Sequence, residues 1–193
     1  ARGRPETRST SPTSILMAPN LKQIKAIVYD IDGVLTDGCI IPVGPNPEDL
    51  VRIVDAKDSF ASRVAAAKGF IIGVISGGDT PALHSRCLHM GASEQNLHLG
   101  VRGKLKVFNQ FLSDNGLKAE EVAYFGDDIP DTQVLRCCGA GFAPADAVPE
   151  ARQAADFVTR RSGGHGCLRE GIEMILKAQD KWHFDEDKYD QIY

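Results

Sequence analysis

Short apolar runs alternate with helix-like stretches along most of this chain, and that alternation constrains the fold more than any other feature of the sequence. The runs at 25–29, 70–75 and 122–125 are bounded by polar residues, which is typical of buried β-strands. Further short strands are expected at 139–142 and 156–158, and the stretches of helical composition are 59–68, 79–90, 103–115, 148–155 and 167–177. Strands separated by such helices predict an α/β fold, a doubly wound parallel sheet with helices on both faces.

One segment departs from the alternation. Two β-prone runs, 39–43 and 49–54, flank the turn-forming residues Gly44-Pro45-Asn46-Pro47. They predict a β-hairpin over about 38–54 that projects after the first strand. An ordinary surface ribbon with no further role is the alternative.

The size and composition fit one globular domain. The 193 residues, 20.9 kDa, include 42% apolar and 25% charged residues. A formal charge of −4 argues against general nucleic-acid binding, and no apolar stretch reaches the roughly 18 to 20 residues that span a membrane. We therefore expect a single domain over 21–180, between an extension at 1–20 and a tail at 181–193.

The two ends of the chain differ in character. Residues 1–16 are rich in Arg, Ser, Thr and Pro, so a flexible extension without function is expected; a transit peptide is the alternative, and translation could start at Met17. Residues 180–193 combine acids with the aromatic residues Trp182, Phe184, Tyr189 and Tyr193. That aromatic content predicts docking onto a neighbouring subunit.

The cysteines indicate a reducing compartment. There are five, an odd number without a C-x-x-C pair, which fits neither a disulfide framework nor a zinc site. The adjacent Cys137 and Cys138 could form only a strained bridge. Reduced, buried thiols in a cytoplasmic protein are the expectation.

Polar side chains gather where the predicted strands end. The set consists of Asp30 and Asp32 after the first strand, Ser76 after the second, Lys104 at the start of a helix, and Asp127, Asp128 and Asp131 after the third strand. Parallel sheets bind ligands beyond the carboxyl ends of their strands, where these groups would converge. Carboxylates suit Mg²⁺, and the metal with a lysine would offset the repulsion between carboxylates and a phosphate dianion. The set therefore indicates a magnesium site able to hold a phosphoryl group.

The D-x-D-G motif taken alone is also found in other kinds of site. An EF-hand loop would need an oxygen ligand at Val34, glycine at Leu35 and glutamate at Ile41, and all three are missing. Acids that only cap a turn are an alternative for the motif taken alone. A two-component receiver domain uses similar groups, but its lysine comes last, whereas here an acidic cluster follows Lys104.

The order of these motifs resembles that of the haloacid dehalogenase superfamily of phosphohydrolases. The resemblance rests on Asp30-Ile31-Asp32-Gly33-Val34-Leu35-Thr36-Asp37-Gly38, Ser76-Gly77, Lys104 and Gly126-Asp127-Asp128-x-x-Asp131, and it covers about 24–177. Within the superfamily, the chain resembles a capless, tetrameric subfamily. This narrower resemblance rests on the first motif and on Gly163-Gly164-His165-Gly166-Cys167-Leu168-Arg169-Glu170. The resemblance implies a phosphoric monoester hydrolase that acts on the 8-phosphate of an eight-carbon keto-deoxy sugar acid, in lipopolysaccharide precursor synthesis.

The resemblance also implies a role for each motif residue. Asp30 would be the nucleophile that forms an aspartyl-phosphate, and Asp32 would protonate the leaving oxygen and then take a proton from water. Mg²⁺ would be held by Asp30, the backbone carbonyl of Asp32 and Asp127, with Asp128 and Asp131 as secondary or outer ligands. The phosphoryl oxygens would be bound by Ser76, Gly77 and Lys104.

The spacing of the motifs leaves no room for a cap domain. Only 43 residues separate Asp32 from Ser76, and 22 separate Lys104 from Asp127. The predicted helices, strands and hairpin consume both gaps. In the resembling subfamily a homotetramer closes each open site, and the hairpin predicted here fits that arrangement.

Contacts to the sugar are expected from two basic residues. Lys57 lies where relatives carry a basic residue before Asp, and Arg169 could pair with a carboxylate of the substrate. The glycine-rich stretch 163–170 would permit close backbone approach to a ligand. The alternative is a loop and helix start in which Arg169 pairs with Glu170 or Glu173.

One departure from the subfamily bears on the substrate. Many relatives place Arg after the Ser-Gly pair, but this chain has Gly78-Asp79. A phosphatase of a nine-carbon keto-deoxy sugar acid phosphate is therefore an alternative, and a non-catalytic tetramerising domain is another. No membrane or nucleic-acid partner is expected.

Overall fold

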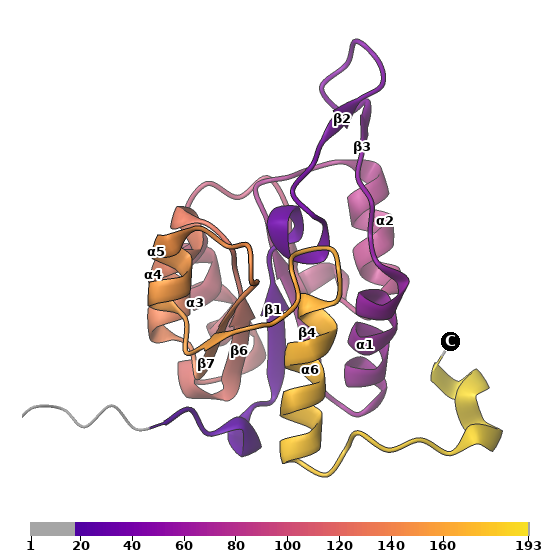
Figure 1. Ribbon diagram of the computed structural model, residues 1–193, viewed down its shortest axis with the longest axis vertical. Helices are drawn as coiled ribbons and strands as arrows, with labels where there is room; N and C mark the ends of the chain where they lie inside the picture. The colour runs from indigo at the N-terminus through magenta and orange to yellow at the C-terminus, as the bar shows by residue number, and fades with distance from the viewer. Residues whose placement is uncertain (1–17, 193) are drawn as a thin grey trace, which may run out of the picture.

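Six strands form one parallel sheet at the centre of the protein, which we describe from a computed structural model over residues 18–192 (Figure 1). Their order is β5-β4-β1-β6-β7-β8, and every neighbouring pair runs parallel. The bounds are β1 (Ala26–Tyr29), β4 (Ile71–Ile75), β5 (Leu97–His98), β6 (Val122–Phe125), β7 (Ala140–Ala143) and β8 (Phe157–Val158). The predicted fold class is confirmed.

Helices cover both faces of the sheet because its strands are apolar on both sides. In β1, Ile27 and Tyr29 enter one core cluster while Ala26 and Val28 enter the other. The first cluster includes side chains of α1 (Ala56–Ala67), α2 (Pro81–His89) and α6 (Cys167–Ala178). The second includes side chains of α3 (Lys104–Asn115), α4 (Thr132–Cys137) and α5 (Pro149–Ala154).

The predicted element boundaries differ from the observed ones mainly at helix starts. The helix predicted from 59 begins three residues earlier, because the Asp55 side chain caps it by accepting the Lys57 N–H at 2.7 Å. The helix predicted from 79 begins two residues later, at Pro81, because Thr80 is its N-cap: the Thr80 hydroxyl accepts the Leu83 N–H at 3.4 Å.

The predicted hairpin is present and extends beyond the body of the protein (Figure 1). Its ladder is shorter than the β-prone runs, with β2 (Ile41–Pro42) antiparallel to β3 (Leu50–Val51). The hairpin carries exposed apolar side chains, among them Ile41, Val43 and Ile53 at 49%, 63% and 65% exposure. The hairpin, α1 and β4 follow one another between Asp32 and Ser76.

The first and last long helices are joined by a buried carboxylate. Asp58 on α1 is fully buried and accepts N–H groups of Gly166 at 3.0 Å and Arg169 at 2.7 Å, at the start of α6. Burial raises the pKa of Asp58 to about 6, although these hydrogen bonds lower it. The start of α6 is thereby fixed to the first turn of α1.

The aromatic residues of the C-terminal tail contact this chain itself. Trp182 and Phe184 pack against the core that α1 and α6 share, with the Phe184 ring centroid 6.1 Å from that of Phe60. Lys68 donates to the His183 carbonyl at 3.3 Å. Trp182 and Phe184 thus find apolar partners in their own chain, while docking of the tail onto a neighbouring subunit stays a prediction and Tyr193 lies outside the described residues.

Other expectations concern the chain ends, the cysteines and the membrane. Most of the extension predicted at 1–20 lies outside the described residues. All five cysteines are unpaired thiols, of which Cys87 and Cys167 are buried. Among residues 18–192, no helix combines the length and apolar character needed to cross a bilayer.

Candidate active site

The chain turns sharply after β1, and the turn carries the first two predicted site residues. Asp30 follows the strand, and Ile31–Leu35 form a tight helical turn in which Gly33 adopts φ +88°. A β-carbon at Gly33 would overlap the carboxylate of Asp127. Glycine at this position therefore both allows the left-handed backbone and lets the first motif meet Asp127 of the fourth.

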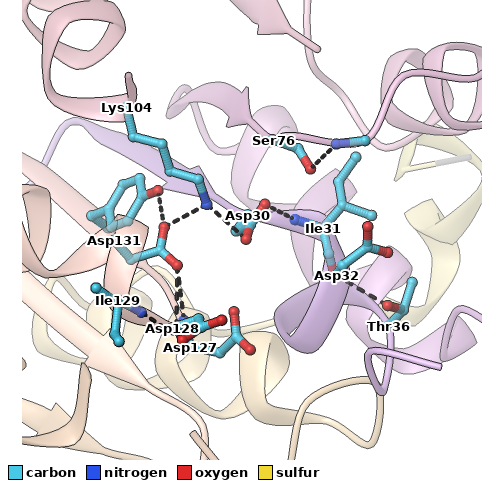
Figure 2. Close-up of polar contacts among 12 residues, drawn as sticks. Asp30, Ile31, Asp32, Thr36, Ser76, Lys104, Asp127, Asp128, Ile129 and Asp131 are labelled. Atoms are coloured by element: carbon cyan, nitrogen blue, oxygen red, sulfur yellow. Dashed lines mark hydrogen bonds and ion pairs between the residues drawn. The ribbon is translucent and has the colours of Figure 1, made fainter. Parts of the chain in front are cut away.

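Lys104 joins two of the predicted carboxylates (Figure 2). Its Nζ lies 2.7 Å from Asp30 Oδ2 and 2.7 Å from Asp131 Oδ1. The residue begins α3, and like Asp30 it is only 7% exposed. A buried lysine needs such partners, since an unpaired charge away from water is costly.

Asp131 is held by hydrogen bonds on both of its oxygens. Oδ1 accepts from the Tyr124 hydroxyl at 2.6 Å as well as from Lys104, and Oδ2 accepts the N–H groups of Asp127 at 3.2 Å and Asp128 at 3.3 Å. These bonds fasten the loop after β6 to the floor of the site. Asp128 is exposed, and its side chain caps the next turn by accepting the Ile129 N–H at 2.7 Å.

Crowded carboxylates give the site its electrostatic character. Burial, opposed by Lys104, raises the pKa of Asp30 to about 6. Burial and repulsion from Asp30 and Asp131 raise the pKa of Asp127 to about 7. For Lys104, burial lowers the pKa, but the attraction of Asp30 and Asp131 outweighs it and the pKa is raised. The site thus carries more negative charge than one lysine balances.

A divalent cation fits this excess of negative charge. Asp30, Asp127 and Asp131 each offer a carboxylate oxygen, and the three oxygens lie within 4.8 Å of one another. Hard oxygen donors are those that Mg²⁺ prefers. Asp131 is fully buried and its oxygens accept four hydrogen bonds, whereas each oxygen of Asp30 has a single partner, so Asp30 and Asp127 are the better placed ligands.

The predicted phosphate-binding residues line the same cleft as the carboxylates. Its volume is about 460 Å³, and its walls include Asp30, Asp32, Ser76, Gly77, Lys104, Asp127, Asp128 and Asp131. Ser76 is fully buried and its hydroxyl accepts the Gly78 N–H at 3.3 Å. The structure therefore brings together all the motif residues that the sequence placed at one sheet edge.

Asp32 has a partner that the sequence did not predict. Arg52, which follows β3, donates from Nε to Asp32 Oδ1 at 2.6 Å and from Nη2 to Oδ2 at 3.1 Å. Arg102, exposed on the cleft wall, is the other basic residue that was missed. The one available signal for Arg52 was its place as a lone charge in the apolar run 50–54.

Two glycines of the glycine-rich stretch lie close to backbone of the same chain, and an approach of this stretch to a ligand stays a prediction. A β-carbon at Gly163 would overlap the Gly33 carbonyl oxygen, and one at Gly164 would overlap the Asp37 backbone. The Gly164 N–H donates to the Val34 carbonyl at 2.9 Å. These glycines permit close approach between two backbone segments, and so support the loop that carries Asp30 and Asp32.

The residues predicted to contact the sugar lie in a separate hollow. Lys57 and Arg169 line a hollow of about 800 Å³ at the start of α6. Arg169 Nε lies 2.7 Å from Glu173 Oε1, and its guanidinium lies 5.3 Å from the ring centroid of Trp182. In this chain Arg169 thus follows the alternative of pairing with Glu173.

Comparisons with known proteins agree with the geometry. Residues 101–169 match the sequence model of the haloacid dehalogenase-like hydrolase family. The chain is 34% identical over 177 residues to the 3-deoxy-D-manno-octulosonate 8-phosphate phosphatase of Escherichia coli strain K12, covering 92% of this chain and 91% of that protein.

Solved structures show the same likeness. The 3-deoxy-D-manno-octulosonate 8-phosphate phosphatase of Yersinia pestis matches with a TM-score of 0.79 at 31% identity, covering 84% of this chain and 85% of that one. The enzyme of that name from Moraxella catarrhalis, in complex with magnesium, phosphate and the sugar acid, matches with a TM-score of 0.79 at 30% identity, covering 84% and 91%.

Proposed function

Because the chain belongs to the haloacid dehalogenase-like hydrolase family, we propose that it is a magnesium-dependent phosphatase that hydrolyses 3-deoxy-D-manno-octulosonate 8-phosphate to the free sugar acid and phosphate. The observation that carries the proposal is the cleft in which Asp30, Lys104 and Asp127 meet beside Asp32 and Ser76. A phosphatase of this kind would act in lipopolysaccharide precursor synthesis, in the cytoplasm.

In the first half of the reaction, an Asp30 oxygen attacks phosphorus and the bond from phosphorus to the sugar oxygen breaks. Asp32 gives its proton to that leaving oxygen, and Asp30 becomes an aspartyl-phosphate. In the second half, water attacks phosphorus, Asp32 takes the proton from this water, and the Asp30 carboxylate is regenerated as phosphate leaves. The Ile31 N–H, 2.7 Å from Asp30 Oδ1, keeps the attacking group at the sheet edge.

Other residues hold the phosphoryl group and the metal. Ser76, Gly77 and Lys104 would bind the phosphoryl oxygens as charge spreads over them. Asp30, Asp127 and the backbone carbonyl of Asp32 would hold Mg²⁺, which neutralises charge on the transferring phosphoryl group when bound. Asp128 and Asp131 would keep these ligands in place.

Removing magnesium is expected to stop turnover. Phosphate release from the eight-carbon substrate should fall by about 10³-fold or more on chelation and return when Mg²⁺ is restored, since the carboxylates then repel the substrate's phosphate. The measurement is kcat/KM with eight-carbon and nine-carbon sugar acid phosphates and with p-nitrophenyl phosphate. The eight-carbon substrate should exceed the nine-carbon one by about tenfold or more.

Each alternative has its own outcome in this panel. A higher kcat/KM for the nine-carbon substrate would mean that the nine-carbon sugar acid phosphate is the substrate of this phosphatase. If no phosphate ester were hydrolysed with magnesium present, the proposal would fail in favour of a non-catalytic assembly domain. Restoration by Mg²⁺ after chelation is the control for damage caused by the chelator.

We further propose that the protein is a homotetramer assembled through its hairpins. A cleft without a cap stays open to water, and a neighbouring copy could close it. The exposed apolar side chains of the hairpin, including Ile41, Val43 and Ile53, supply an apolar contact surface.

The double variant Ile41→Asp with Ile53→Asp should dissociate this assembly. Charges on an apolar contact surface should weaken association by about 100-fold or more, leaving a monomer of 20.9 kDa by sedimentation. Val158→Asp, a like change at a side chain 48% exposed on β8, is the matched control. A wild-type protein that sediments as a monomer would contradict the proposal.

A further inference from the structure

The hairpin carries one charged side chain into the rim of the cleft. Arg52 directly follows β3, and its neighbours Val51 and Ile53 are 42% and 65% exposed. The Arg52 side chain is only 7% exposed, because its guanidinium lies against Asp32. The projecting hairpin therefore buries an arginine at the active site while its apolar side chains remain outside.

The contact between these residues has the geometry of carboxylate recognition. Two neighbouring guanidinium nitrogens of Arg52, Nε and Nη2, donate to the two oxygens of Asp32 at 2.6 Å and 3.1 Å. Such forked pairs are how arginine binds planar carboxylates. In the proposed reaction an Asp32 oxygen must meet the leaving oxygen of the sugar, so the pair has to open. Arg52 then needs another anion.

The space beside this pair is open because residue 78 is glycine. A β-carbon at Gly78 would lie 3.3 Å from both Arg52 Nη2 and Asp32 Oδ2, so any larger side chain would press on the pair. Arg52 also forms part of the wall of a second hollow, of about 260 Å³, with Leu83 and Arg86. Arg52 thus lies between the cleft that contains Asp30 and a hollow that can receive the part of a substrate remote from its phosphate.

Resting on the proposed function, we propose that Arg52 binds the carboxylate of the sugar acid and so selects carboxylated phosphate esters over neutral ones. The phosphate and the carboxylate lie at opposite ends of the eight-carbon chain. When the phosphate lies beside Asp30 and Lys104 on the floor of the cleft, the carboxylate at the other end of the substrate must lie away from that floor. Arg52, at the rim, is placed to bind it there. The substrate carboxylate replaces Asp32 in the guanidinium fork and leaves Asp32 free to meet the leaving oxygen.

Two other cations of the cleft are less suited to this role. Lys104 already contacts two carboxylates and begins α3 at the floor. Arg102 lines the cleft but is exposed, and an exposed arginine loses much of its binding energy to water and salt. The guanidinium of Arg52, by contrast, is buried and is already oriented to bind a carboxylate through two nitrogens.

The test compares Arg52→Ala and Arg52→Lys with the wild-type enzyme. In Arg52→Ala, kcat/KM for 3-deoxy-D-manno-octulosonate 8-phosphate should fall about 10- to 100-fold more than kcat/KM for p-nitrophenyl phosphate, and this extra loss should arise chiefly through KM. The inhibition constant of the free sugar acid, measured against p-nitrophenyl phosphate, should rise by the same 10- to 100-fold, and that of inorganic phosphate should not change. Lysine keeps the charge without the fork, so Arg52→Lys should recover only part of the loss.

Folding of these variants is not at risk, because Asp32 keeps a side chain 27% exposed to water when Arg52 is shortened. Arg136→Ala, at an exposed arginine of α4, controls for the general loss of positive charge. An equal loss for both substrates, or a rise in the sugar acid inhibition constant in Arg102→Ala instead, would overturn the inference. Wild-type enzyme that hydrolyses p-nitrophenyl phosphate but not the sugar acid phosphate would overturn the proposed function itself.

Discussion

Asp30→Asn is expected to abolish phosphate release, with kcat reduced by about 10⁴-fold or more. The amide cannot form the aspartyl-phosphate, and it removes one of the charges that attract the metal. Folding should be retained, because an amide oxygen can still accept the Ile31 N–H, and Lys104 keeps its contact with Asp131. The measurement is single-turnover phosphate release, together with a search for phosphorylated protein by mass.

A matched variant keeps the interpretation of this result clear. Asp114→Asn makes the same chemical change at an exposed aspartate of α3, which accepts a hydrogen bond from Gln110 at 2.6 Å. It should turn over at the wild-type rate. If Asp30→Asn released phosphate as fast as Asp114→Asn does, the nucleophile would have to be another group.

Lys104→Met should damage both stability and catalysis. Methionine fills similar space without charge, so Asp30 and Asp131 would face each other unbalanced in a buried site, costing about 3–5 kcal/mol in the free energy of unfolding. Turnover should fall by about 10³-fold because the phosphoryl group loses its cationic partner.

The stability loss in Lys104→Met should depend on pH. The folded-state pKa of Asp30, about 6, already lies above its ordinary value of 3.8, and removing Lys104 raises it further. A carboxyl whose pKa is raised by folding binds its proton more tightly in the folded state, so stability falls as pH rises from about 4 through that pKa. The deficit of Lys104→Met against wild type should therefore be larger at pH 8 than at pH 5.

Chemical unfolding at both pH values measures this effect. Lys106→Met, at an exposed lysine of the same helix, is the control and should match wild type in stability and rate. Equal stability of Lys104→Met and Lys106→Met at pH 8 would mean that the buried pair is not what holds this site together.

Most of the sheet could be predicted from sequence because its central strands are long apolar runs that end abruptly in polar motifs. The strand expected at 122–125 matches β6 residue for residue, and β1 and β4 each start one residue late. By contrast β5, only Leu97–His98, escaped prediction. Two residues are too few to show an alternation of apolar and polar side chains. This edge strand is defined by its pairing with Val74 and Ile75 of β4.

In the site, too, the residues marked by local sequence motifs could be predicted, whereas the contacts that depend on the tertiary fold could not. Motif residues such as Asp30 and Asp127 could be assigned together because strand ends converge at one edge of a parallel sheet. The pairing of Arg52 with Asp32 could not, since it depends on how the hairpin folds back across 20 residues. The glycines at 163 and 164 gave the correct signal of close approach, but sequence could not say that the approaching group was backbone.

That backbone contact has a consequence for how the enzyme is made. The loop after β1 is completed by Gly163 and Gly164, and by Cys167, whose thiol donates to the Val34 carbonyl at 3.2 Å. Asp30, the proposed nucleophile, is therefore translated well before the segment that supports its loop. A growing chain cannot assemble a competent site before that segment is synthesised, so a message truncated ahead of residue 163 should yield protein that neither binds nor cleaves phosphate esters.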